Sequence, residues 1–142
     1  MIETWRRLAL YLLLFGIAGT SVELLFLGHF EDWWQWAPLA LFGLGLVLAG
    51  AVALRPARVV VRTLQGLMST YLVAAALGLY LHLRANLEFE LELHPSMAGT
   101  ELIWEILRGA IPALAPGAMA QLGLLGLLVC FRHPALGPKA GS

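Results

Sequence analysis

Four long stretches of apolar residues divide the chain, and clusters of charged or aromatic residues separate them. They cover residues 8–28, 38–54, 64–83 and 112–131. A helix crosses a hydrocarbon layer about 30 Å thick with about 20 apolar residues, so each stretch can form one crossing. The pattern predicts an all-α membrane protein: a single domain over residues 1–142, built as a four-transmembrane-helix bundle with an outer segment at 84–111 and a cytoplasmic tail at 132–142.

The composition agrees with this prediction. The chain is 60% hydrophobic and 13% charged, whereas soluble domains are about 45–50% apolar and about 25% charged. The zero formal net charge provides no overall field to attract nucleic acid. The single cysteine, Cys130, excludes an intrachain disulfide and a cysteine-rich metal cluster within the chain.

Basic residues gather on one side of the predicted membrane, where seven of the nine fall: Arg6, Arg7, Arg55, Arg58, Arg62, Arg132 and Lys139. The opposite side holds seven acidic residues: Glu31, Asp32, Glu88, Glu90, Glu92, Glu101 and Glu105. Short loops rich in Lys and Arg stay in the cytoplasm. We therefore expect a multi-pass protein of a bacterial inner membrane, with both termini cytoplasmic and the acidic side periplasmic. The first stretch is too long for a cleaved signal peptide, which predicts a retained helix.

Aromatic residues mark the predicted membrane boundary. Trp33, Trp34 and Trp36 precede the second stretch, at the level where amphipathic rings meet lipid headgroups. Together with Glu88, Glu90, Glu92 and Trp104, they form the predicted partner interface. The acidic side favours a basic soluble periplasmic protein, and the apolar stretches favour lipids and other membrane subunits as neighbours.

The outer segment contains two local patterns. Residues 88–93 alternate charged and apolar side chains, which is a strand signal. A lone strand leaves open edges, so the favoured interpretation is an extended loop with its apolar face on the membrane or the bundle. Residues 99–108 show apolar positions at helical spacing, with Thr100 able to cap the start. That pattern predicts a short amphipathic helix, either in the outer membrane interface or as a lid across the end of the bundle.

A few polar residues could carry chemistry. Glu23 lies near the outer end of the first stretch, where a carboxyl group is costly unless it has a partner. His29 and His82 end the first and third stretches, and His94 lies in the outer segment. Glu23 and these three histidines are the predicted metal ligands, and they suit a transition-metal ion. A haem held by His29 and His82 is disfavoured because nothing else marks a haem pocket.

Polar and small residues inside the stretches predict helix packing. Gln65, Ser69, Thr70, Tyr71 and Gln121 could form hydrogen bonds between helices. Pro38 and Pro112 suit the first turns of the second and fourth helices. Glycines and alanines allow close approach of neighbouring helices, among them Gly45, Gly78, Gly123 and Gly126.

The sequence shows no nucleophile motif and no phosphate-binding loop. It favours a non-catalytic accessory or assembly subunit of a larger membrane complex, such as an energy-converting one. The alternative is a small cation or metal-handling transporter that uses Glu23 and the outer-face histidines. A membrane enzyme is a third alternative, less favoured because no acid–base pair can be named.

Overall fold

The protein is helical over most of its described length. The structure is a computed structural model that describes residues 2–137. Its elements are α1 (Ile2–Phe26), η1 (Trp33–Gln35), α2 (Trp36–Leu54), α3 (Arg58–Leu93), α4 (Gly99–Arg108), α5 (Gly117–Cys130) and η2 (Pro134–Leu136). The all-α prediction is confirmed for these residues. Lys139 and the rest of the predicted tail beyond 137 lie outside them.

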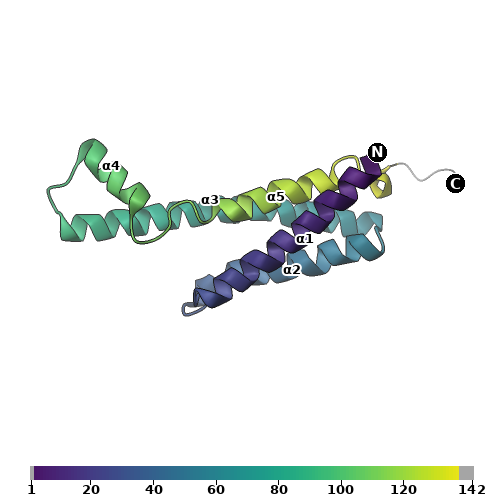
Figure 1. Ribbon diagram of the computed structural model, residues 1–142, viewed down its shortest axis with the longest axis horizontal. Helices are drawn as coiled ribbons and strands as arrows, with labels where there is room; N and C mark the ends of the chain where they lie inside the picture. Colours follow the sequence, from purple (N-terminus) through teal and green to yellow (C-terminus); the bar gives the residue numbers. More distant parts are fainter. Residues whose placement is uncertain (1, 138–142) are drawn as a thin grey trace.

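Four helices pack side by side around an apolar core. Helix α3 packs on α2 and α5, and α1 packs on the other side of the same two helices (Figure 1). The start of α1 meets the residues after α5, because the Arg6 guanidinium donates to the backbone carbonyl of Arg132 at 3.2 Å. We call this the terminal end of the molecule. The opposite end, the distal end, comprises residues 27–36 and 80–116.

Close helix contacts depend on three of the predicted small residues. A Cβ at Gly123 would lie 2.9 Å from the backbone oxygen of Met68, and one at Gly126 would overlap the Met68 side chain. A Cβ at Gly45 would overlap the Tyr71 hydroxyl, which donates to the carbonyl of Leu41 at 2.9 Å. Tyr71 therefore makes a bond between helices as predicted.

Other polar side chains inside the apolar stretches bond within their own helix. Ser69 and Thr70 donate to the carbonyls of Gln65 and Gly66, each four residues back along α3. These bonds satisfy the hydroxyl groups locally, so they do not set the register between α3 and its neighbours.

The outward surface of the helices is strongly apolar. Helix α1, α2 together with η1, and α3 are each long and apolar enough to cross a membrane, and α5 is a shorter apolar helix. Large apolar side chains such as Phe15, Val47 and Val73 are exposed on these helices. A surface of this kind suits contact with lipid chains or with other apolar helices.

Helix α3 corrects the prediction for residues 88–93, which form neither a strand nor an extended loop. These residues continue α3 without a break to Leu93. Glu and Leu are strong helix formers, and Arg84 supports the extension by pairing with Glu88 at 2.7 Å, one turn away. Pro95 ends the helix because the residue before a proline disfavours helical backbone. The helix propensity of these residues and their continuity with α3 therefore outweighed the period-two alternation of charged and apolar residues.

The predicted amphipathic helix is present as α4, but two details differ from the prediction. Thr100 does not cap it, since the cap position falls on Ala98 and no side chain bonds there. Helix α4 packs on α3 alone among the described elements, so it is not a lid across the other helices. It folds back beside the end of α3 (Figure 1).

The fourth apolar stretch is helical over a shorter range than predicted. Helix α5 begins at Gly117, with Pro116 at its cap position. Pro112 lies in the irregular segment before it and not in a first helical turn, whereas Pro38 does lie in the first turn of α2. The proline pair explains the difference, because the backbone before each proline is biased away from helix.

Candidate functional site

Two histidines, His29 and His82, lie near each other at the distal end. The position of His29 depends on how α1 ends. Gly28 takes a positive φ of 66° just after α1, where glycine carries no steric cost. The His29 amide then donates to the carbonyl of Leu24 and the Gly28 amide to that of Leu25. This is a Schellman turn, and it directs the chain and His29 away from the axis of α1.

His82 on α3 faces the segment that leads into α5. Its Nδ1 lies 2.9 Å from the carbonyl oxygen of Pro112. A carbonyl only accepts, so Nδ1 carries the proton and, in the neutral ring, Nε2 keeps a free lone pair. Burial, and then the nearby His82 ring, lower the pKa of His29. The uncharged state of His29 is therefore favoured at this position.

Asn86, one turn beyond His82, joins α3 to the chain on both sides of Gly109. Its side chain is 1% exposed. The amide nitrogen donates to the carbonyls of Ile106 and Ile111 at 2.9 and 2.8 Å, and the amide oxygen accepts from the Ile111 backbone N–H at 3.1 Å. We call this set of three bonds the Asn86 latch. Sequence reasoning missed it; the only signal is a polar, weak helix former inside a long helix.

Residues 111–116, which follow the Asn86 latch, run along α3 and contact it at successive helical turns. Ile111 bonds to Asn86 and Pro112 bonds to His82, and Pro116 lies close enough to Gly78 that a Cβ there would be 3.1 Å away. Positions 86, 82 and 78 are successive turns of one face of α3. Irregular backbone is thus held against a helix over residues 111–116.

The structure does not gather the four predicted metal ligands into one cluster. Within residues 2–137, no three His, Cys, Asp or Glu side chains come together as a metal site would need. Glu23 is exposed on α1, and His94 lies twelve residues beyond His82, about 18 Å along the helix. His29 and His82 are the pair that remains, and metal binding there stays a prediction.

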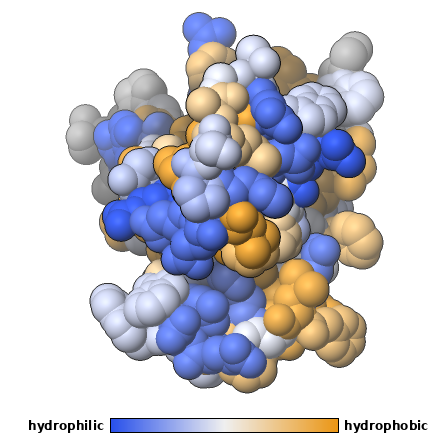
Figure 2. Space-filling model, turned by 90° about the vertical axis from the view of Figure 1, so that its left-hand side faces the viewer, coloured by the Kyte–Doolittle hydropathy of each residue, from blue (hydrophilic) through white to orange (hydrophobic). Residues whose placement is uncertain are grey.

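The predicted interface residues lie at the distal surface. Trp33, Trp34 and Trp36 are exposed at the start of α2, and Trp104 is exposed on α4 with the Arg108 guanidinium 5.7 Å from its ring. On α3, Glu88 and Glu92 are exposed and Glu90 is half-buried. Figure 2 shows this end as a mainly hydrophilic surface with smaller apolar areas. Whether these residues contact a partner stays a prediction.

A groove of about 450 Å³ runs between α3 and α4. It is lined by Tyr80, Leu83, Arg84, Leu87, Glu88 and Ile106. The apolar side chains come from both helices, and the Arg84–Glu88 ion pair closes one side. Ile103 and Leu107 adjoin Ile106 on the apolar arc of α4, at three- and one-residue spacing, and both are exposed.

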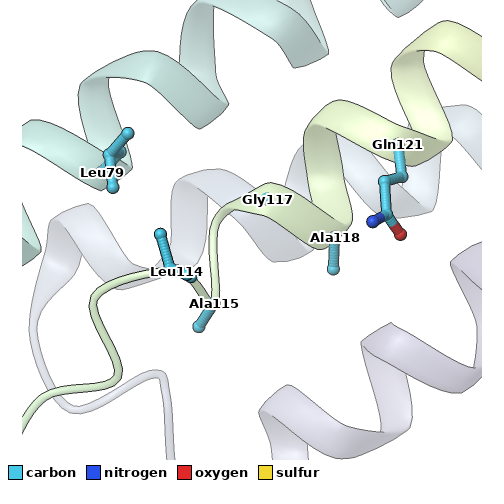
Figure 3. A pocket seen from close by; sticks show the side chains of 6 residues that line it. All are labelled: Leu79, Leu114, Ala115, Gly117, Ala118 and Gln121. Carbon is cyan, nitrogen blue, oxygen red and sulfur yellow. The ribbon is translucent and has the colours of Figure 1, made fainter. Parts of the chain in front are cut away.

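A second groove, of about 480 Å³, lies where α5 begins. Figure 3 shows Ala115, Ala118 and Gln121 directed to the same side of this segment, with the Gln121 carboxamide as the one polar group among the six lining residues. The lining suits an apolar chain with at most one hydrogen-bonding group. It offers no charged side chain for catalysis.

Comparison with protein-family models, curated proteins and solved structures finds no match for this chain.

Proposed function

We propose that this protein crosses a bacterial inner membrane four times as a helix bundle, with its terminal end in the cytoplasm. The apolar outer surface and the lengths of α1, α2 and α3 support the crossings. Helix α5 has 14 residues, about 21 Å, so the irregular segment 111–116 completes the fourth crossing. Such backbone is tolerated in a membrane where a neighbouring helix satisfies its polar groups. Helix α3 does this for two residues of the segment, because Asn86 bonds to Ile111 and His82 donates to the carbonyl of Pro112.

The orientation follows from charge. Among the described residues, Arg6, Arg7, Arg132 and the arginines at the α2–α3 link lie at the terminal end, and seven of the nine acidic residues lie in the distal segments 27–36 and 80–116. Loops rich in Lys and Arg remain cytoplasmic. The distal end then faces the periplasm, where α3 and α4 project from the membrane.

The role we propose is a non-catalytic accessory or assembly subunit of a larger membrane complex. One observation carries it: α4 contributes no buried residue to the fold and contacts α3 alone, yet the Asn86 latch fixes it in place. A helix that adds so little to the core, while exposing Ile103, Trp104 and Leu107, is suited to contact another protein.

Native purification in mild detergent tests this role, with mass spectrometry of the proteins that co-purify. We expect a stoichiometric complex larger than the single chain. The matched variants are Trp104→Gln, on the exposed arc of α4, and Trp5→Gln, an equally exposed tryptophan at the terminal end. The first should release the complex and the second should not. A stable lone monomer from gently solubilised membranes contradicts the proposal.

The His29–His82 pair favours a second candidate, a small cation or metal-handling transporter. The bond from His82 to Pro112 leaves a ring nitrogen free, which is how metal-binding histidines are oriented. Glu23 would then act as a separate titrating group near the end of α1. Metal analysis of the purified protein tests the pair, and retention of full cation-dependent activity in Glu23→Gln argues against a role for the carboxyl group.

A further inference from the structure

We propose that the groove between α3 and α4 binds a basic amphipathic helix of another protein on the distal side of the membrane. This inference rests on the proposed accessory role and names the surface and the chemistry of the partner. Amphipathic helices bind by laying apolar side chains into such grooves at helical spacing.

The groove provides an apolar floor and a defined width. Leu83 and Leu87 lie one turn apart on α3, and Ile106 faces them from α4. Ile103 and Leu107 are not among the lining residues but lie within one turn of Ile106 on α4, with exposed fractions of 59% and 48%. Together these side chains can receive two or three apolar residues of an incoming helix.

The groove is formed before any partner arrives. The Asn86 latch ties the end of α4 to α3 through three hydrogen bonds. Gly109 beside it leaves no room for a side chain, because a Cβ there would lie 2.5 Å from the Asn86 amide carbon. A preformed site spares the ordering cost that association otherwise carries.

Charge selects the partner. Residues 84–111 contain two arginines and five glutamates, a formal net charge of −3. Glu88 lies in the groove, where it pairs with Arg84, and the unbalanced negative charge comes from the other glutamates, such as Glu101, exposed at the start of α4. A basic helix gains from this field and an acidic one is repelled. Anionic lipid headgroups are disfavoured for the same reason.

A second copy of the chain does not fit as the occupant. Its basic residues, apart from Arg84 and Arg108, lie at the terminal end or in the tail, across the membrane from the groove of a copy inserted in the same direction. Neutral lipid fits poorly too, since α3 has 36 residues, about 54 Å, and its last turns rise past a hydrocarbon layer about 30 Å thick.

A peptide-binding experiment tests the proposal with the full-length protein in phosphatidylcholine nanodiscs. The probe is a short leucine–lysine peptide that folds as an amphipathic helix. Its controls are the leucine–glutamate peptide of the same pattern, a scrambled leucine–lysine peptide, and empty nanodiscs. We expect the basic amphipathic peptide to bind at least about tenfold more tightly than either control peptide, with affinity falling as salt rises.

Matched variants locate the binding. The double variant Ile103→Gln/Leu107→Gln changes two exposed apolar side chains of α4 next to the lining residue Ile106 and should weaken binding about tenfold or more. Phe89→Gln changes a side chain of similar exposure, 46%, two residues or about 200° around α3 from Leu87, and should change binding less than about twofold. Circular dichroism of each variant confirms that the helices remain.

The inference is overturned by equal binding of the acidic and basic peptides, by wild-type binding of the double variant, or by a phospholipid that native mass spectrometry finds on the wild type and not on the double variant. Self-association abolished by the double variant would instead assign the groove to a second copy. Failure of the accessory role is a separate result. If the native complex survives in the double variant, the accessory role stands and the groove is excluded as its binding site. If the protein purifies alone but binds the basic peptide, the groove proposal stands and the accessory role fails.

Discussion

The two halves of α3 are held in place by different forces. Its first half packs on α2 and α5 through an apolar core in which Leu64, Met68 and Tyr71 are fully buried. Its last turns contact only α4 and the segment after it, and there Asn86 is the buried side chain. The first region is stabilised by its apolar core, and the second depends more strongly on the three hydrogen bonds of the Asn86 amide. We call the first region the packed region, and we call the second, the last turns of α3 together with α4 and the segment after it, the projection. Packing therefore sets the global stability, and hydrogen bonding sets the local stability of the projection.

The largest effect should come from filling a close contact in the packed region. Gly123→Val places a side chain against the backbone oxygen of Met68, and overpacking of this kind costs about 3 kcal/mol. We expect a large fall in the melting temperature of the detergent-solubilised protein. Gly66→Val is the matched control, because a Cβ there meets nothing within 4 Å. Equal melting temperatures for the two variants would show that α3 and α5 do not pack as described.

The next largest effect should be confined to the projection. Asn86→Leu removes three hydrogen bonds and leaves buried backbone groups unpaired, which costs about 2 kcal/mol locally. Amide hydrogen exchange over residues 99–111 should then rise about 30-fold, while exchange in α1 and α2 stays unchanged. Glu92→Leu introduces the same side chain at an exposed position of the same helix and should leave α4 protected.

A second variant disturbs the Asn86 latch from the segment that Asn86 bonds to, without a change in α3. Gly109→Ala brings a Cβ into the Asn86 amide without altering α3. It should reproduce the local rise in exchange. If exchange instead increases throughout the protein, the projection and the packed region form one cooperative unit, and the contrast between them fails.

A smaller effect is expected from the single bond that Tyr71 makes between helices. Tyr71→Phe keeps the ring against Phe42, whose centroid is 5.4 Å away, and removes the bond to Leu41. The loss should be about 1 kcal/mol, seen as a modest fall in melting temperature. Tyr80→Phe, at an exposed tyrosine, is the control and should change little.

The same contrast explains what the sequence could predict. Apolar stretches identified every helix of the packed region, because burial or lipid contact requires that pattern regardless of detail. The alternation at 88–93 failed as a strand signal because residues 2–137 contain no strand to pair with it and the preceding helix had no reason to stop before Pro95. The pattern of a half-buried strand is informative only when a sheet is available to receive it.

The site was harder to predict because it depends on tertiary contacts. His29 and His82 were expected to be neighbours from their common predicted depth, which follows from helix length alone, and the nearby His82 is a cause of the lowered pKa of His29. Glu23 and His94 were grouped with them by side-chain type, without knowledge of the face of α1 or of the extra turns of α3. The bonds of Asn86 could not be predicted from residue types, because all three go to backbone groups, 20 and 25 residues away in the chain.

The smallest expected effect lies at the junction of the two regions, where His29 meets His82. Burial and the neighbouring ring lower the pKa of His29 in the folded protein, below the ordinary value of about 6.5. The unfolded chain therefore binds this proton more readily, and the folded state loses stability as the pH falls through about 6.5. We expect a slightly lower melting temperature at pH 5.5 than at pH 7.5, and a smaller difference in His29→Gln.

Nuclear magnetic resonance of labelled histidine side chains measures the same effect directly. His29 should titrate below pH 6.5, and His82→Gln should raise its pKa only in part, because burial, the larger cause, remains. A full return to the ordinary value would assign the shift to His82 alone. An unshifted His29 in the wild type would show that the ring is solvated and that the two histidines do not meet. In that case no titrating group would link the packed region to the projection, and the stability of their junction would not depend on the charge of His29.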